Sequence, residues 1–359
     1  MPQRPHPHPE GPGDPTDEVS RLLASASEPM NPMILLEGPP LSGISRAMYE
    51  GLQRSLPQAR LAQFTALGLA QVAAQPDFTS RFGGGGRYVL WLDGLTPADL
   101  VLLGSGVLDK TLPHAVVLAS VDTVWHDRLL ADPSPATAPA RTVLLEYAHR
   151  IQVPFTLTAR ERNYLREKGY PVSKGLAESL VGGENLVRHY RRAARSAPEG
   201  HLLVQAAIDV RRCGIHRPLT EDELYRLWCS RTDHDNSRPL FERALHWAAA
   251  LPDGTSTGLL YRAAGGTSPD WRVLAYAAGA DDGNHGHKPR PLGAREWNEV
   301  AQHLPESGDQ FNLGIAAHLH GRSDTATTAL AQATRAADAG HPAAEAAATA
   351  LHHLRAGTG

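Results

Sequence analysis

The first half of the chain carries short apolar runs separated by segments with a helical pattern. Three runs are apolar without alternation, as expected for strands buried on both faces of a parallel sheet. They occupy 32–37, 88–93 and 114–121. A weaker strand is expected at 59–64, and amphipathic helices at 17–25, 43–56, 67–74 and 123–130. Strands that alternate with helices predict an α/β domain with a parallel sheet, which we place at residues 17–136.

The second half of the chain is dominated by helical patterns. We expect a helical domain at 137–198, where Thr158 and Glu161 form a capping box. Further helices, followed by two strand-like pieces at 256–263 and 270–277, predict a winged-helix-like domain at 199–280. The predicted fold class is therefore α/β plus α.

The C-terminal segment, residues 292–359, is also helical in pattern. Its spaced alanines, its closing Gly321 and the sequence AADAGHPAA resemble one helical hairpin of the tetratricopeptide (TPR) or Sel1-like type. A single unit leaves a helical face without a neighbouring repeat. We therefore expect these C-terminal helices to bind a protein partner or a second copy of the chain.

Composition narrows the classes of protein that the chain can belong to. Its 359 residues are 20% charged with a formal net charge of −3, which argues against binding nucleic acid through overall charge. No apolar run reaches 18 residues, and Cys213 and Cys229 are the only cysteines, so we expect a cytoplasmic protein without a membrane span or a disulfide scaffold. Six prolines in the first 15 residues predict a disordered tail at 1–16, with His6 and His8 solvated.

The segment between the first strand and its helix is the main candidate for chemistry. Residues 38–46 read GPPLSGISR, close to the phosphate-binding P-loop pattern GxxxxGK[ST]. Gly38 and Gly43 would let backbone N–H groups surround phosphates, and the Ser45 hydroxyl would bind Mg²⁺. The lysine that contacts the β- and γ-phosphates in such loops is replaced by Ile44. Arg46 is a poor substitute, because on a helix it points away from the loop mouth.

The rest of such a site comes from the ends of the following strands. Asp93 ends the run at 88–93 and is suited to hold Mg²⁺ together with Ser45. Gly94 stands where hydrolytic proteins usually add a second acid that polarises the attacking water. Asp122 stands where a polar or cationic side chain that contacts the γ-phosphate is expected. Positioning and electrostatics supply nearly all the catalysis of phosphoryl transfer, so these replacements disfavour efficient hydrolysis.

Lysine is rare in this chain and absent from its first 109 residues. Only four of the 35 basic residues are lysines. A lysine from elsewhere in the α/β domain can reach the loop only from Lys110. The candidate cofactors are therefore ATP or ADP with Mg²⁺, or none. If a nucleotide binds, the residues expected to hold it are Gly38, Gly43, Ile44, Ser45, Arg46 and Asp93.

The order of these segments resembles the STAND class of P-loop ATPases, particularly a group found in actinobacteria. The resemblance is carried by LLEGPPLSGISRAMYEGLQRSLP, YVLWLDGL, HAVVLAS, RIQVPFTLTARER and the stretch 201–276. That family has GKSR where this chain has GISR at 43–46, and WLDD where it has WLDG at 91–94. The resemblance implies a switch that holds ADP when off and exchanges it for ATP.

The sequence leaves three functions open. The first, which we expect, is a non-catalytic regulatory or scaffolding protein with weak or no nucleotide binding. The second is an active ATP/ADP-dependent signalling switch whose lysine comes from a partner or from a neighbouring protomer. The third is DNA binding by the winged helix, although Arg238 and Arg243 are offset by Asp233, Asp235 and Glu242.

Overall fold

The computed structural model describes residues 14–25, 31–83, 87–172, 174–232, 237–263, 270–336 and 340–356. Residues 1–13 of the tail expected at 1–16 therefore lie outside the described residues. Residues 14–16 correct that expectation, because helix α1 (Pro15–Ser25) begins within them. The Asp14 carboxylate accepts a hydrogen bond of 2.8 Å from the Thr16 N–H, and Pro15 suits a first helical turn because no N–H is needed there.

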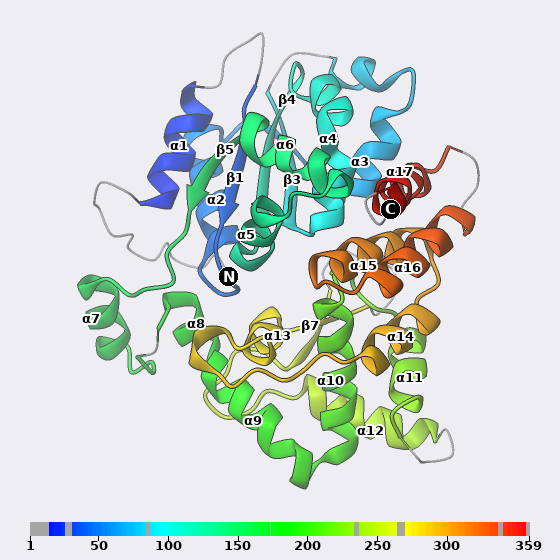
Figure 1. Cartoon of the computed structure of the whole chain (residues 1–359). Helices are drawn as coiled ribbons and strands as arrows, with labels where there is room; N and C mark the ends of the chain where they lie inside the picture. The colour runs from blue at the N-terminus through cyan, green and yellow to red at the C-terminus, as the bar shows by residue number, and fades with distance from the viewer. Residues whose placement is uncertain are drawn as a thin grey trace.

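Within the described residues, parallel strands form one sheet in the spatial order β2-β3-β4-β1-β5 (Figure 1). The strands are β1 (Met33–Glu37), β2 (Arg60–Gln63), β3 (Tyr88–Leu95), β4 (Ala115–Val121) and β5 (Ala148–Gln152). Strand β1 lies between β4 and β5, with Met33 paired to Val117 on one side and to Ala148 on the other. The parallel sheet predicted from the hydrophobic pattern is confirmed, and so is the α/β plus α fold class.

Helices cover both faces of the sheet, which explains the unbroken apolar pattern of β1. The helical elements here are α2 (Ile44–Ser55), α3 (Ala66–Ala73), η1 (Phe78–Phe82), α4 (Pro97–Thr111), α5 (Thr123–Ala131), η2 (Pro135–Thr137), α6 (Ala138–Thr142) and η3 (Val143–Tyr147). Met33 and Leu35 belong to a large core that includes α3 and α4. Ile34 and Leu36 face a smaller core formed with α1 and α2. Burying each such side chain stabilises the fold by about 1.5–3 kcal/mol.

Strand β5 lies inside the segment 137–198 that is expected to be helical, so that expectation is wrong for these residues. β5 is an edge strand with the sequence AHRIQ, and Ile151 is its only buried residue. Most of its side chains face solvent, so it has no apolar run that a sequence pattern could detect. Three helices follow: α7 (Ala159–Glu167), α8 (Leu176–Val181) and α9 (Gly183–Ser196). The capping box of Thr158 and Glu161 is present at the start of α7.

The next elements follow the helix–helix–helix–hairpin order expected for a winged helix. They are α10 (Pro198–Arg212), α11 (Glu221–Cys229), α12 (Arg238–Ala249), β6 (Leu260–Arg262), β7 (Trp271–Val273), α13 (Ala275–Asp281) and η4 (Asn284–Gly286). Strands β6 and β7 pair antiparallel, with Tyr261 opposite Arg272. The strand expected at 270–277 ends at Val273, because its alanine-rich continuation forms helix α13, where Tyr276 is buried.

The C-terminal helices pack against one another and against the α/β half (Figure 1). They are α14 (Ala294–His303), α15 (Ser307–Leu319), α16 (Ser323–Arg335) and α17 (Pro342–Ala356). Helices α15 and α17 contact α4, and the Thr96 hydroxyl donates a 2.7 Å hydrogen bond to Asn312 Oδ1. Part of the helical face expected to await a partner is therefore covered by the chain itself. None of the described helices is both long and apolar enough to cross a membrane.

Candidate functional site

The β1–α2 loop (residues 38–43) joins the carboxyl end of a central strand to the first turn of α2. Leu41 and Gly43 have left-handed backbone conformations, with φ of 64° and 94°. Gly38 must be glycine, because a Cβ there would lie 2.8 Å from Ser42 Oγ and 2.9 Å from the Val153 carbonyl oxygen. Gly43 is the N-cap of α2 and gives it no side-chain hydrogen bond. The first N–H groups of α2 are therefore suited to hold an anionic ligand.

Ile44, at the position of the expected lysine, is a packing residue. It is half-buried and packs against the smaller core between α1, α2 and the sheet. Its Cδ1 atom lies 3.2 Å from the point that a Cβ on Gly38 would occupy, so the isoleucine side chain folds back over the start of the loop. The loop therefore presents an apolar side chain where a cation normally contacts phosphate.

The two other cations considered from the sequence do not replace the lysine. Arg46 Nε donates a 2.7 Å hydrogen bond to Glu50 Oε1, which holds the guanidinium beside a residue one turn further along α2. Lys110 lies on α4 and donates to the Ala73 carbonyl oxygen at 3.3 Å, away from the residues that surround the loop. Within the described part of the chain, no lysine lines the space in front of the loop.

Ser45 and Asp93 meet at the mouth of the loop. The Ser45 hydroxyl donates a 2.8 Å hydrogen bond to Asp93 Oδ2, and the Ser120 hydroxyl donates to the other carboxylate oxygen. Ser120 also accepts a 2.7 Å hydrogen bond from the Gly94 N–H, which fixes β3 against β4. A hydroxyl and a carboxylate are oxygen ligands of the kind that Mg²⁺ prefers, so this pair fits the predicted metal position.

Gly94 and Asp122 have structural reasons for being where they are. Gly94 has a φ of 74° at an irregularity of the β3–β4 pairing, a conformation that costs other residues about 1–2 kcal/mol. A second acid at position 94 would therefore be strained. Asp122 is the N-cap of α5 and accepts a 2.9 Å hydrogen bond from the Val124 N–H. Burial raises the pKa of Asp122. Its carboxylate caps a helix, and it cannot act as the cationic sensor expected at this position.

A cavity of about 940 Å³, here called the loop cavity, opens in front of the β1–α2 loop. Its size falls within the range of small-molecule binding sites. Three parts of the chain form its walls: the α/β half, the segment from α10 to β7, and the C-terminal helices. Beyond the loop itself, its polar lining residues include Asp93, Ser120, Asp122, Arg211, His216, Arg217, Tyr261, Arg272, Asp309 and Asn312.

Arg211 and Arg272 bring positive charge into the loop cavity. Neither guanidinium has a hydrogen bond or ion pair with any residue that the structure describes. Burial lowers the pKa of Arg211, and the nearby Tyr261 and Asp122 partly offset that shift. Arg272 is exposed, but Arg211 is partly buried, and a partly buried charge without a partner is costly, so an anion in this cavity would remove part of that cost.

Arg217 ties two walls of the loop cavity together. Its guanidinium lies 2.5 Å from both Glu223 Oε1 and Asp309 Oδ2, so it joins the start of α11 to α15. Asp309 is nearly fully buried, and burial raises its pKa, while the hydrogen bond from Arg217 opposes that shift. The position of the C-terminal helices at the cavity is thus held by a buried ion pair.

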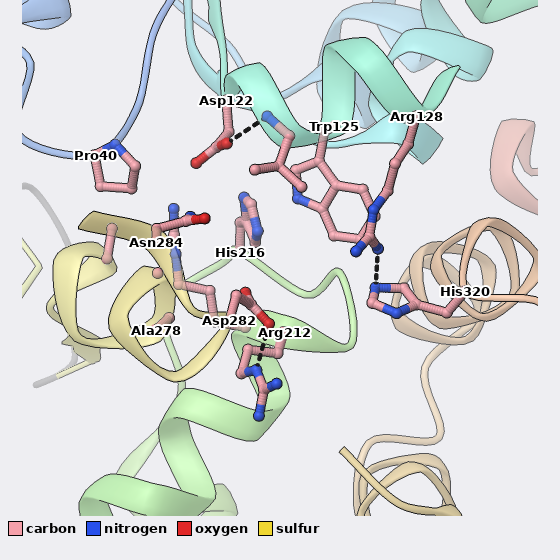
Figure 2. Close-up of a pocket in the computed structure, with 14 residues that line it drawn as sticks. Pro40, Asp122, Trp125, Arg128, Arg212, His216, Ala278, Asp282, Asn284 and His320 are labelled. Atoms are coloured by element: carbon pink, nitrogen blue, oxygen red, sulfur yellow. Dashed lines mark hydrogen bonds and ion pairs between the residues drawn. The ribbon is translucent and has the colours of Figure 1, made fainter. Parts of the chain in front are cut away.

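A second, smaller cavity of about 40 Å³ adjoins the loop cavity and shares Asp122, Arg211 and His216 with it (Figure 2). Burial and the neighbouring Arg211 hold the pKa of His216 well below its ordinary value, so the imidazole is neutral. Its Nδ1 lies 3.4 Å from the Gly94 carbonyl oxygen. Arg212 lines the same cavity and donates to Asp282 at 2.7 Å.

The structure brings together some of the predicted site residues and adds others. Ser45 and Asp93 are in direct contact, whereas Ile44 and Arg46 have packing and ion-pair roles. Ser120, Arg211, His216 and Arg272 line the loop cavity without belonging to a short motif, so no local pattern identifies them.

No protein-family model and no curated protein sequence matches the chain. The solved structures to which the chain is similar include three with TM-scores of 0.31 to 0.35. The Orc1 protein of Aeropyrum pernix in complex with DNA is 12% identical over 74% of this chain and 91% of that one. Cdc6p from Pyrobaculum aerophilum is 14% identical over 85% and 97%, and AMPPCP-bound DnaA from Aquifex aeolicus is 11% identical over 91% and 94%. This likeness assigns neither a family nor a function to the chain.

Proposed function

We propose that this chain is a non-catalytic, STAND-like regulatory protein that binds a nucleotide weakly in the loop cavity. The observation that carries the proposal is the Arg211 guanidinium, which has no partner among the described residues and lines the same cavity as a P-loop-like turn that lacks its lysine. The phosphates of a nucleotide in this cavity would supply negative charge to the first N–H groups of α2 and to the space that Arg211 lines. Arg272 would add a second cation at the more exposed side of the same cavity.

Mg²⁺ with ATP or ADP suits the oxygen atoms at the loop mouth. Ser45 and Asp93 would hold the ion, since their side-chain oxygens already lie 2.8 Å apart. The backbone at Gly38 and Gly43 would surround the phosphates. When bound, Mg²⁺ would supply charge neutralisation for the phosphate oxygens.

Hydrolysis is the activity that this arrangement supports least. Ile44 places an apolar side chain at the lysine position, Gly94 carries no acid, and Asp122 caps a helix. Each of these positions is normally used to stabilise charge or to orient water during phosphoryl transfer. We infer that a bound nucleotide would act as a ligand that changes how the cavity walls pack.

Calorimetry on the full chain tests this proposal. Purified protein is titrated with ATP, ADP and GTP, with and without Mg²⁺, alongside Arg211→Gln and Arg272→Gln. We expect wild-type binding in the submillimolar to millimolar range and at least a fivefold loss in either variant. Arg188→Gln, an exposed arginine on α9 that does not line the loop cavity, is the matched control. Absence of heat with every nucleotide, or equal affinity in all variants, contradicts nucleotide binding.

The second candidate is an active ATP/ADP-dependent switch, favoured by the intact contact between Ser45 and Asp93. A lysine supplied in trans would complete the site. To separate the two candidates, phosphate release from ATP is measured per chain for wild type and for Ser45→Ala over a range of protein concentrations. A rate per chain that rises with protein concentration in wild type, and is absent in Ser45→Ala, favours the switch. Turnover equal to that of Ser45→Ala at every concentration favours the non-catalytic protein.

DNA binding by the winged helix stays a minor proposal. On α12, Arg238 pairs with Glu221 at 2.5 Å and with Asp222 at 3.4 Å, and it lies over the Tyr225 ring. A guanidinium held by acidic residues contributes little to a phosphate-binding face.

We also retain the proposal that the C-terminal helices bind a protein partner or a second copy through their solvent-facing sides.

A further inference from the structure

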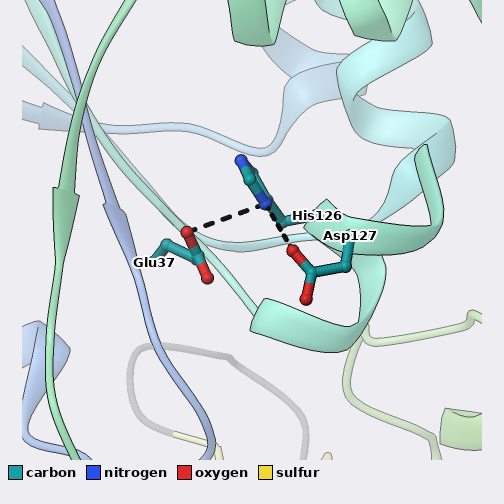
Figure 3. A group of neighbouring side chains, drawn as sticks. All are labelled: Glu37, His126 and Asp127. Atoms are coloured by element: carbon teal, nitrogen blue, oxygen red, sulfur yellow. Dashed lines mark hydrogen bonds and ion pairs between the residues drawn. The ribbon is translucent and has the colours of Figure 1, made fainter. Parts of the chain in front are cut away.

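A group of side chains at the carboxyl end of β1 has metal-ligating chemistry that is separate from the loop cavity. Glu37 ends β1, and His126 and Asp127 lie on α5, so that the three side chains converge (Figure 3). One potential ligand atom from each residue lies within 4.8 Å of the other two. Of these residues, Glu37 and His126 are almost fully buried, while Asp127 faces solvent.

We propose that Glu37, His126 and Asp127 bind a divalent transition-metal ion of the Zn²⁺ class. His126 Nδ1 lies 3.1 Å from Asp127 Oδ1 and 3.6 Å from Glu37 Oε2. Ligand atoms bound at about 2.0–2.1 Å in tetrahedral geometry lie about 3.3 Å from one another, so these spacings suit a shared ion with little movement. One imidazole with two carboxylates is a donor set that Zn²⁺ accepts, and three protein ligands leave one position for water.

The buried carboxylate of Glu37 is only partly satisfied by the rest of the described chain. Its Oε2 accepts a hydrogen bond from Arg150 Nε on β5, and its Oε1 has no hydrogen-bond partner among the described residues although it is buried. A buried acceptor left unpaired costs about 1–3 kcal/mol. Oε2, the oxygen 3.6 Å from His126 Nδ1, is the proposed ligand atom, and the hydrogen bond that it accepts from Arg150 would set its orientation.

The position of this site gives the ion a structural consequence. Glu37 immediately precedes Gly38, and its carbonyl oxygen accepts a 2.7 Å hydrogen bond from the Val153 N–H. An ion that joins Glu37 to His126 and Asp127 would tie the end of β1 to α5 just before the β1–α2 loop begins. Asp127 is the solvent-facing ligand, so metal can enter and leave without unfolding the sheet.

Titration of chelator-treated protein with Zn²⁺ tests the proposal. Wild type is compared with Asp127→Asn, whose side chain is 67% exposed and can change without disturbing the core. Because the chain has 18 histidines, background binding is subtracted through two controls. His149→Gln replaces an exposed histidine on β5, and Asp77→Asn replaces an exposed carboxylate away from the proposed site. We expect wild type and both controls to bind one more equivalent than Asp127→Asn, or to bind it at least tenfold more tightly.

Thermal melting and cobalt spectroscopy separate a metal site from a simple ion cluster. Zn²⁺ should raise the melting temperature of wild type and of the two controls but not that of Asp127→Asn, because a ligand stabilises only the state that binds it. Co²⁺ should give the visible absorption of a four-coordinate ion in wild type and lose it in His126→Gln. If Asp127→Asn binds Zn²⁺ as well as wild type does, or if the Co²⁺ spectrum is unchanged in His126→Gln, then His126 only bridges two carboxylates and the proposal is wrong.

Discussion

Ser45 Oγ donates a 2.8 Å hydrogen bond to Asp93 Oδ2, although the two residues lie 48 positions apart. The contact joins the first turn of α2 to the end of β3 across the carboxyl edge of the sheet. The pair matches the serine–carboxylate part of the phosphate-binding site that the sequence predicts, in a chain with Ile44 at the position of the expected lysine. The chain therefore keeps the Ser45–Asp93 contact but lacks the cation expected at the neighbouring position 44. Single substitutions can test these two features separately.

Ile44→Lys should restore a missing phosphate contact. Hydrogen bonds to charged groups contribute about 1.5–3 kcal/mol, so we expect ATP affinity to rise at least tenfold. Stability should fall by about 1 kcal/mol because an apolar side chain leaves the smaller core. Calorimetry and thermal melting measure the two effects, and Ile44→Met serves as the apolar control without a gain in affinity. A folded Ile44→Lys protein that binds ATP no better than wild type would mean that the loop does not hold phosphate.

Gly94→Ala should destabilise the fold through its backbone alone. A Cβ at this position meets no heavy atom within 4 Å, but φ is 74°. We expect the free energy of unfolding to fall by about 1–2 kcal/mol in chemical denaturation. Gly106→Ala is the matched control, since its Cβ also meets nothing within 4 Å and α4 accepts alanine. The control should be neutral or more stable by about 0.5–1 kcal/mol, and equal losses in both variants would refute the strain argument.

Arg217→Ala should loosen the C-terminal helices from the rest of the chain. It leaves the buried Asp309 carboxylate without its cation, and we expect a loss of about 2–3 kcal/mol in the free energy of unfolding. Arg238→Ala breaks the exposed pair with Glu221 and should cost less than about 1 kcal/mol. Hydrogen exchange on α15 should increase in Arg217→Ala only. Unchanged exchange there would show that packing of the apolar face alone holds these helices.

His320 should make the protein less stable in mild acid. Burial, helped by the neighbouring Arg128, lowers the pKa of His320 to about 4, and the ring lies against Trp125 and Trp297. An unfolded histidine titrates near 6.5. Between about pH 6.5 and pH 4 the unfolded state therefore takes up a proton that the folded state does not, and stability falls as the pH falls.

Chemical denaturation curves from pH 8 to pH 4.5 check that the free energy of unfolding falls as the pH falls. Replacing the buried imidazole in His320→Phe should flatten the loss in acid, whereas His246→Gln, at an exposed position on α12, should leave the slope unchanged. The explanation fails if His320→Phe loses stability in acid as steeply as wild type does.

The sequence by itself determined the elements whose signals are local. Unbroken apolar runs predicted β1, β3 and β4, because strands covered on both faces need apolar residues at every position. The capping box of Thr158 and Glu161 predicted the start of α7, since its hydrogen bonds join residues three positions apart. Local motif spacing also predicts that Gly38, Gly43, Ser45 and Asp93 form a degenerate phosphate-binding set.

Only the tertiary structure decided what surrounds that set. Edge strand β5 has one buried residue, so its pairing with β1 left no apolar pattern to detect. Arg211 and Arg272 come from α10 and β7 and reach the loop cavity because distant elements pack there. The side chain of Glu37 meets those of His126 and Asp127 at the carboxyl end of the sheet, where β1 ends near α5. Short-range patterns record propensity and burial, whereas charge placement in a cavity depends on which surfaces the packing brings together.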